Sequence, residues 1–132
     1  MNDPNMPLRI AILPVTPFQQ NCTLLFDTES KLGVVVDPGG DLARIEEGIA
    51  QAGFAPTAII LTHGHIDHAG GAAELAAKLK IKVIGPHRAD KHHLDQLPAK
   101  GASYGMPGAR VVTPDRWLDE GDTVEEIGRA HV

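Results

Sequence analysis

Residues 62–68 read Thr-His-Gly-His-Ile-Asp-His, which places three imidazoles and one carboxylate within six consecutive positions. Histidine nitrogen and carboxylate oxygen are the usual protein ligands of Zn²⁺ and related divalent metals. His63 and His65, two residues apart on an extended turn, can point the same way and hold one metal. Asp67 and His68, where a helix is expected to begin, can face a second metal. The spacing therefore predicts half of a two-metal hydrolytic site.

A plainer interpretation of Asp67 makes it a helix N-cap, accepting hydrogen bonds from backbone N–H groups near Gly70. An N-cap accounts for Asp67 alone and leaves the neighbouring histidines unexplained. With seven histidines in 132 residues, chance gives this spaced pattern about once in a thousand such chains. The sequence therefore favours metal binding over capping.

The composition is that of an ordinary globular chain, and 132 residues are enough to bury a core in one domain. The formal net charge is −5 and no basic block occurs, so we expect neither a nucleic-acid nor a membrane partner. Met1–Arg9 lacks an apolar stretch, and no apolar run reaches the roughly eighteen residues of a membrane span. Cys22, the only cysteine, lies in an apolar run that predicts a buried, inert thiol. A single cysteine suits a reducing compartment, so we expect a cytoplasmic protein.

Three apolar runs at the start of the chain, Leu8–Val15, Asn21–Asp27 and Leu32–Asp37, are separated by turn residues. They predict an antiparallel meander of strands. A helix is expected next over Asp41–Ala52, because apolar residues recur there at helical spacing, and Gly53 is placed to end it.

The second half of the predicted fold is a strand–helix–strand unit formed by Thr57–Leu61, Ala69–Leu79 and Lys82–Ile84, which implies parallel pairing and an α/β class. Ligand sites in such sheets gather beyond the carboxyl ends of strands. The histidine motif, His63–His68, follows the first strand of this unit. Asp37 ends a strand of its own, and we predict that it hydrogen-bonds a ligand histidine or fixes the loop, with a role in the turn alone as the alternative.

The remaining histidines of the central region, His87, His92 and His93, lie in a polar, helix-like stretch. We interpret them as a solvated face, with lining of a substrate entrance as the alternative. Trp117 and Leu118 are predicted to be core residues before a hairpin.

The histidine motif, His63–His68, resembles the metal-binding signature of the metallo-β-lactamase fold superfamily, and residues 35–40 (Val-Val-Asp-Pro-Gly-Gly) fit that family's pattern as well. Two flanking runs, Pro14–Cys22 and Thr113–Asp122, resemble small bacterial glyoxalase-II-like hydrolases. The resemblance extends over essentially the whole chain. It implies the N-terminal half of an αββα sandwich.

That resemblance also implies a hydrolase with two zinc ions per complete site, iron or manganese being possible instead. His63 and His65 would bind the first metal, and Asp67 and His68 the second, with Asp67 also assigned as the catalytic residue. Water acidified by the metals would attack the carbonyl of a thioester or ester, such as an acyl-glutathione. An iron-dependent persulfide dioxygenase of the same fold and a non-catalytic metal-binding fragment are the alternatives.

One departure from the family concerns the end of the chain, since family members continue with further histidine and aspartate ligands that these 132 residues lack. Thr123–Ile127 reads as a strand, Gly128-Arg129 as its turn and Ala130–Val132 as the start of a returning strand. We therefore expect residues 1–132 to be one metallo-β-lactamase-like domain truncated at its C-terminus. Such a chain should bind metal weakly and show negligible thioester hydrolysis alone, and its oligomeric state is left open.

Overall fold

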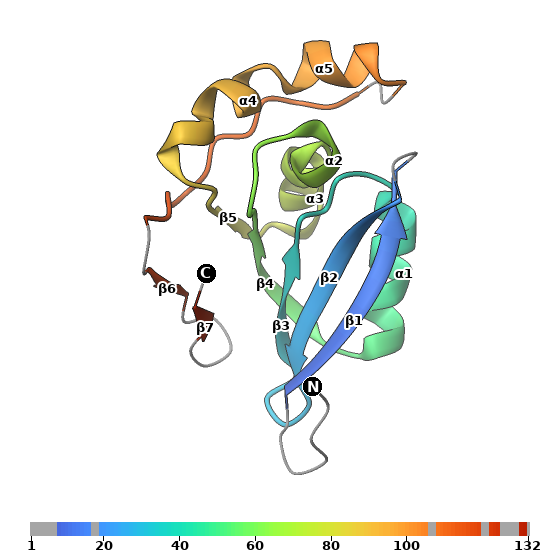
Figure 1. Ribbon diagram of the computed structural model, residues 1–132. Coiled ribbons are helices and arrows are strands. Elements are labelled where there is room, and N and C mark those ends of the chain that lie inside the picture. Colours follow the sequence, from blue (N-terminus) through green and yellow to red (C-terminus); the bar gives the residue numbers. More distant parts are fainter. Residues whose placement is uncertain (1–7, 17–18, 106–107, 120–121, 125–129, 132) are drawn as a thin grey trace.

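A mixed five-stranded sheet forms the centre of the fold, with strand order β1-β2-β3-β4-β5 (Figure 1). The computed structural model describes residues 8–16, 19–105, 108–119, 122–124 and 130–131. The strands of the sheet are β1 Leu8–Val15, β2 Gln20–Asp27, β3 Leu32–Val36, β4 Ala55–Ile60 and β5 Lys82–Ile84.

The first three strands pair antiparallel, which confirms the predicted meander. β4 pairs parallel with both β3 and β5, which confirms the strand–helix–strand unit and the α/β class. Four strand limits differ from the sequence-based ranges: β2 begins one residue earlier, β4 begins at Ala55 instead of Thr57, and β3 and β4 each end one residue earlier. β3 ends at Val36 because Asp37 adopts a left-handed backbone conformation with φ 54.

Helix α1 (Leu42–Ala52) connects β3 to β4 and packs against one face of the sheet (Figure 1). Ile45 and Ile49, four residues apart, are its buried residues, as expected from helical spacing. Gly53 ends the helix in the left-handed conformation at φ 77, and its N–H donates to the Ile49 carbonyl. The predicted helix and its terminating glycine are therefore confirmed.

The single helix predicted over Ala69–Leu79 is wrong in detail, because the chain forms two helices there. These are α2 (Ile66–Ala69) and α3 (Ala72–Leu79). The N–H of Gly71 donates to the Pro38 carbonyl at 2.9 Å, where a continuous helix would direct it to the turn before. A contact with a distant loop thus divides the helix.

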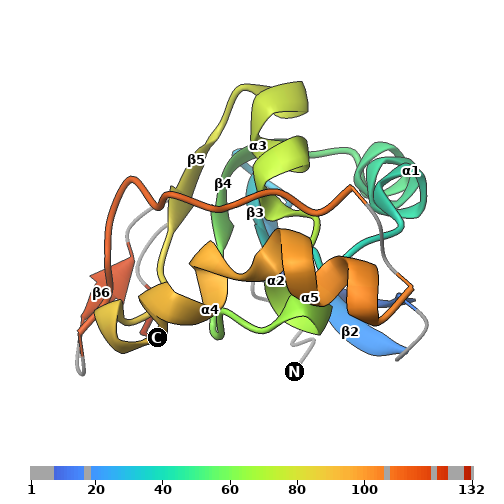
Figure 2. The ribbon, with the colours of Figure 1, turned by 90° about the horizontal axis from the view of Figure 1, so that it is seen from above.

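The polar stretch after β5 forms a 3-10 turn, η1 (Arg88–Asp90), and a short helix, α4 (Lys91–Asp95). A further helix, α5 (Leu97–Ser103), was not predicted. Helix α5 lies beside α2 and contacts α4, and residues 108–119 then run back across the helices to the edge of β5 (Figure 2).

The main core lies between the sheet and helices α1 to α5. Its fully buried side chains include Leu24, Val35, Ile59, Leu75 and Leu97. A smaller cluster occupies the opposite face of the sheet and contains Leu118, which confirms that residue as core. No helix in the described ranges is long and apolar enough to cross a bilayer.

At the end of the chain, β6 (Thr123–Val124) and β7 (Ala130–His131) pair antiparallel as a separate two-stranded sheet. The pairing agrees with the hairpin predicted there. The predicted turn at Gly128-Arg129 and the rest of the first strand, up to Ile127, lie outside the described residues.

Candidate metal centre

The histidine motif emerges at the edge of the sheet where parallel strands β3 and β4 both end. Asp37 follows β3, and its N–H donates to the carbonyl of Ile60, the last residue of β4. β2 runs in the opposite direction, so its first residue, Gln20, comes to the same edge. Three separate parts of the chain therefore meet around residues 62–68, at the position where α/β folds place their ligands.

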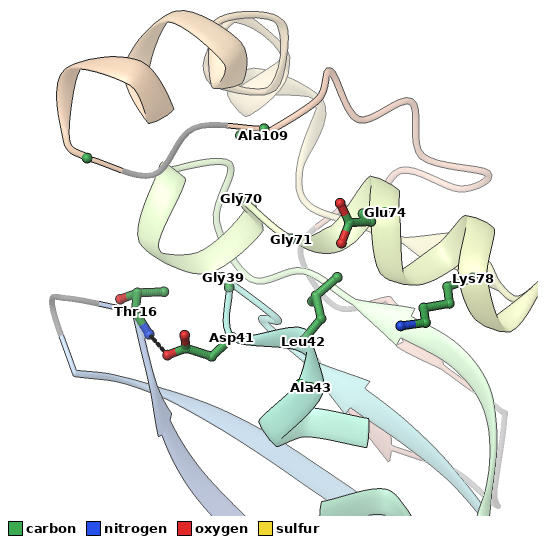
Figure 3. A pocket seen from close by; sticks show the side chains of 13 residues that line it. Thr16, Gly39, Asp41, Leu42, Ala43, Gly70, Gly71, Glu74, Lys78 and Ala109 are labelled. Atoms are coloured by element: carbon green, nitrogen blue, oxygen red, sulfur yellow. Dashed lines mark hydrogen bonds between the residues drawn. The ribbon is translucent and has the colours of Figure 1, made fainter. Parts of the chain in front are cut away.

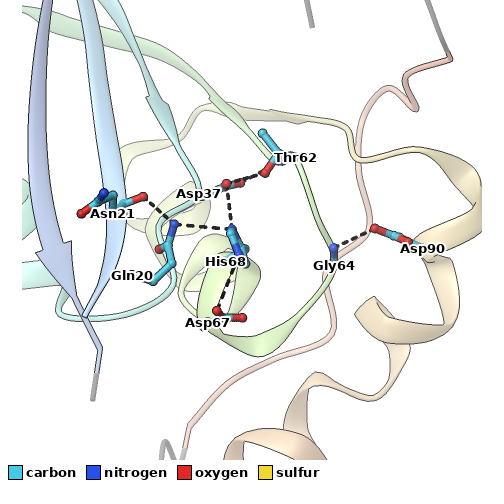
Figure 4. A network of polar contacts seen from close by, with 8 residues as sticks. All are labelled: Gln20, Asn21, Asp37, Thr62, Gly64, Asp67, His68 and Asp90. Carbon is cyan, nitrogen blue, oxygen red and sulfur yellow. Dashed lines mark hydrogen bonds and ion pairs between the residues drawn. The ribbon is translucent and has the colours of Figure 1, made fainter. Parts of the chain in front are cut away.

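Asp37 and His68 are in direct contact at this edge (Figure 4). The Oδ2 atom of Asp37 lies 2.9 Å from Nδ1 of His68, and the Asp37 carboxylate also accepts from the N–H and the hydroxyl of Thr62. A carboxylate only accepts hydrogen bonds, so Nδ1 of His68 carries the proton. The other ring nitrogen, Nε2, is thereby left as the atom that can bind a metal, and it lies 3.6 Å from Oδ2 of Asp67.

Gln20 packs its side-chain amide against the same imidazole. Its Nε2 lies 3.4 Å from Nδ1 of His68 and donates to the backbone carbonyl of Asn21. Since Asn21 fixes the orientation of the amide, Oε1 of Gln20 is left buried and has no hydrogen-bond partner in the described part of the chain. A buried acceptor without a protein partner is uncommon, and this one sits beside the predicted ligands.

The other two histidines of the motif are gathered less tightly. The His63 ring meets the His68 ring edge-on, with centroids 4.7 Å apart, whereas the His63 and His65 rings are 6.1 Å apart. Among the described residues, no three His, Cys, Asp or Glu side chains are arranged to hold one ion together. The structure therefore brings Asp67 and His68 together, but it does not bring His63 and His65 to a common point.

The N-cap interpretation of Asp67 is wrong. Helix α2 begins at Ile66 with His65 in the N-cap position, and no side chain makes a capping hydrogen bond there. Asp67 lies inside the first turn, where its negative charge is favourable near the positive end of a helix.

Glycines let two loops approach each other closely, with Gly39 on one side and Gly70 and Gly71 on the other (Figure 3). A Cβ atom added to Gly39 would lie 1.9 Å from the Asp67 carbonyl oxygen. A Cβ atom on Gly70 would lie 2.6 Å from the Gly39 carbonyl, and one on Gly71 would lie 2.7 Å from the Pro38 carbonyl. The β3–α1 loop thus presses its backbone directly onto the backbone between α2 and α3.

Thr16, which lies between β1 and β2, is hydrogen-bonded to the β3–α1 loop. The Thr16 N–H donates to Oδ2 of Asp41 at 2.7 Å (Figure 3), and both residues have left-handed backbone angles. The N–H of Gln19 donates in turn to the Thr16 carbonyl. Asp41 therefore fixes the start of β2 relative to the β3–α1 loop.

The stretch after β5 contributes two further residues. Oδ2 of Asp90 accepts from the Gly64 N–H at 3.1 Å (Figure 4), which supports the middle of the histidine motif. The His93 ring lies tilted against the His65 ring, with centroids 4.3 Å apart. Burial lowers the pKa of His93, and the nearby charges of His92 and His65 lower it further. His93 is partly buried and lines a cavity with His65, which favours the alternative interpretation of this residue as part of an entrance.

Sequence reasoning missed Gln20, Thr62 and Asp90 as neighbours of the site. The predicted meander contained the signal for Gln20, because antiparallel pairing returns the start of β2 to the end of β3. No local pattern pointed to Asp90. His87 and His92 are exposed, as the solvated-face interpretation predicts.

Comparison with known proteins decides the family. Residues 15–132 match the Metallo-beta-lactamase superfamily. This chain belongs to that superfamily. One curated relative of this superfamily member, hydroxyacylglutathione hydrolase GloC of Haemophilus influenzae, is 36% identical to it over 113 residues. The matched residues cover 86% of this chain and 53% of that protein, so the chain spans about half the length of the relative. The glyoxalase-II-like resemblance is therefore confirmed.

Solved structures confirm the metallo-β-lactamase-type fold class. BLEG-1, a B3 metallo-beta-lactamase, superposes with a TM-score of 0.76 at 29% identity, covering 89% of this chain and 56% of that one. TTHA1623, solved in a di-iron-bound form, gives a TM-score of 0.76 at 28% identity, covering 86% of this chain and 56% of that one. The superfamily member described here thus corresponds to about half of each solved chain.

Proposed function

We propose that this superfamily member contributes the first half of the metal site of a thioester hydrolase of the glyoxalase II kind, with all of residues 1–132 in one domain. The substrate would be an acyl-glutathione or a similar small thioester. The relative named hydroxyacylglutathione hydrolase supports the substrate class. The observation that carries the proposal is the contact of Asp37 with Nδ1 of His68, which leaves Nε2 facing Asp67.

The residues present fit a metal at this position. Two atoms bound about 2.0–2.2 Å from a tetrahedral ion lie roughly 3.4 Å from each other. Nε2 of His68 and Oδ2 of Asp67 are 3.6 Å apart, so one ion can reach both with a small adjustment. A carboxylate on the second nitrogen of the histidine, as Asp37 provides, is the usual support for a metal-binding imidazole.

We assign Asp67 and His68 to one metal and His63 and His65 to the other. Bound divalent metals would supply Lewis-acid chemistry and lower the pKa of water. Asp37 would orient His68 and keep its proton on Nδ1. We retain Asp67 as the catalytic residue because it is more exposed than its neighbour His68. The side chain of Asp67 is 32% exposed, and that of His68 is 23% exposed.

Zinc is our proposed metal, with iron or manganese as the alternatives, since TTHA1623 is known in a di-iron-bound form. No three ligands are gathered in the described part of the chain. We therefore expect weak metal binding and negligible thioester hydrolysis by residues 1–132 alone. Ligands from outside the arrangement described here would have to complete the coordination.

The test combines metal analysis with an assay of S-lactoylglutathione hydrolysis. The assay is run on the 132-residue chain and on the continuous protein if the reading frame extends past codon 132. We expect metal-dependent hydrolysis by the longer protein, abolished by His68→Ala. His87→Ala, which alters an exposed histidine away from the motif, should leave the rate unchanged.

Each of three results would contradict this proposal. Bound mononuclear iron with consumption of dioxygen would support the persulfide dioxygenase. Stoichiometric metal without either reaction would indicate a non-catalytic metal-binding protein. Hydrolysis that survives His68→Ala would place the reaction elsewhere in the molecule.

A further inference from the structure

A cavity of about 310 Å³ lies beside the histidine motif, between the start of α2 and helices α4 and α5. Its size is at the lower end of the range for sites that bind small molecules. One wall is made of Gly64, His65 and Asp67, so a molecule in the cavity would touch two of the proposed metal ligands.

The opposite wall is one face of helix α5 and the residue just after it. Leu97, Lys100 and Tyr104 follow at intervals of three and four residues, so they lie on one side of the helix. Leu97 is fully buried and anchors the helix in the core, whereas Tyr104 is 51% exposed. The cavity therefore combines apolar surface with one ammonium group at its far side.

The ammonium group of Lys100 has no carboxylate partner in the described part of the chain. Two other lysines are paired with carboxylates: Lys91 lies 2.7 Å from Asp95, and Lys78 lies 2.9 Å from Glu46. An unpaired lysine is common on a surface, but this one lines a cavity whose other wall holds proposed metal ligands. With a net charge of −5, the chain as a whole repels anions, so a local cation would be needed to hold one.

We propose that this cavity binds the thiol-carrier part of the substrate and that Lys100 pairs with a carboxylate of that carrier. The inference rests on the proposed hydrolase function, because the function places the reacting carbonyl beside His65 and Asp67. Apolar contact with the exposed ring of Tyr104 would hold the carrier's stem, and Lys100 would distinguish an anionic thioester from a neutral one.

A larger cavity of about 580 Å³ lies on the other side of the α2–α3 junction (Figure 3). It is lined by Glu74, Asp41 and Lys78, and Lys78 is already paired with Glu46. None of the four proposed metal ligands lines that cavity, so it has no comparable link to the reaction.

S-methylglutathione is a suitable probe because its thioether cannot be hydrolysed while its carboxylates are retained. Its binding to the isotopically labelled chain is followed by amide chemical shifts, with zinc and again with a chelator. We expect shifts at Gly64, Lys100 and Tyr104. Lys100→Gln should weaken binding about three- to five-fold, as for the loss of a partly exposed ion pair, and Lys100→Arg should retain most of the affinity.

Two controls separate recognition by Lys100 from general attraction. The diethyl ester of S-methylglutathione, which lacks both carboxylates, should bind wild type and Lys100→Gln equally. Lys91→Gln makes the same charge change on α4 outside the cavity and should leave binding unchanged. Equal weakening by Lys91→Gln and Lys100→Gln, or no shifts around the cavity, would overturn the proposal. Carrier binding that depends on Lys100, found together with absent hydrolysis by the longer protein, would instead count against the proposed function alone.

Discussion

The Asp37 carboxylate lies 2.9 Å from Nδ1 of His68, although 31 residues separate the two in the chain. The parallel pairing of β3 with β4 produces this contact, because it brings the ends of both strands to one edge. Asp37 is nearly fully buried, with 5% of its surface exposed, so water competes little for its carboxylate. Asp37 and His68 should therefore behave as a unit.

Replacing Asp37 with Asn should lower metal affinity about 10- to 100-fold, the range observed when the partner of a ligand histidine is lost. An amide has only one acceptor oxygen, so if that oxygen faces His68, the NH₂ group faces the Thr62 N–H, which the carboxylate accepts. The affinity is measured by competition with a chromophoric chelator. In a double-mutant cycle with His68→Ala the effects should not add, and additive effects would show that Asp37 acts independently of His68.

Replacing both His63 and His65 with alanine should abolish binding of one metal equivalent, because these side chains are the proposed ligands of one ion. Metal uptake is measured by titration followed by elemental analysis. The matched control, His87→Ala with His92→Ala, removes two exposed histidines outside the motif. Equal uptake by wild type and the His63/His65 variant would exclude the motif as the metal site.

The elements that could be predicted from sequence are those set by local pattern. β1 and the core of α1 follow from apolar spacing, with Ile45 and Ile49 buried as expected. The division of the helix at Gly71 could not be predicted, because the acceptor of its N–H is the Pro38 carbonyl on a distant loop. Helix α5 was missed because nothing in its own sequence distinguishes it from the polar stretch before it.

The candidate site also contains residues that could be predicted from the sequence and residues that could not. The four proposed ligands lie within six residues, so the sequence displays them together. Among the groups that support them, Thr62 stands directly before the motif in the chain, whereas Gln20 and Asp90 come from the start of β2 and the turn η1. Only the folded sheet brings those segments to one edge, and local sequence carries little information about such distant contacts.

Gly39→Ala should destabilise the chain by more than about 2 kcal/mol, since the new Cβ would overlap the Asp67 carbonyl and force backbone atoms apart. The free energy of unfolding is measured in denaturant without metal. Gly53→Ala is the control: its Cβ would meet open space, and only the left-handed φ of 77 would cost about 1 kcal/mol. Equal losses would show that the loops are not in close contact.

Burial, with a smaller effect from the charge of Asp37, raises the pKa of the Cys22 thiol from 9.0 to about 12. Above pH 9 the unfolded chain ionises this thiol while the folded chain does not. Its contribution to stability is therefore complete below pH 9 and declines as the pH rises towards 12.

Cys22→Ala should flatten this decline relative to wild type in denaturant unfolding between about pH 8 and 11. The native thiol should also resist thiol reagents at neutral pH. Parallel pH profiles for the two proteins would contradict the assignment. The cytoplasmic location expected from this single cysteine stays a prediction.

Ile10 and Ile12 are 42% and 57% exposed on one face of β1, which stands at the edge of the five-stranded sheet. Exposed apolar edge strands promote self-association. Ile12→Lys should therefore lower the apparent mass of the chain in a sedimentation series over concentration. Val111→Lys, which places the same charge at another exposed apolar position, is the control. A wild type that sediments as a monomer at every concentration would refute the prediction.

In the joint between the β3–α1 loop and the start of α3, the nearest neighbours of the glycines are backbone carbonyl oxygens. Backbone contacts of this kind do not depend on the side chain of a ligand, so exchanging a ligand side chain nearby leaves the backbone distance between Asp37 and His68 intact. Metal binding would then have to immobilise only the imidazoles and one carboxylate of the motif, and the entropy lost would be confined to them. For protein engineering, the joint is a fixed frame on which the ligand at position 67 can be varied to alter metal preference.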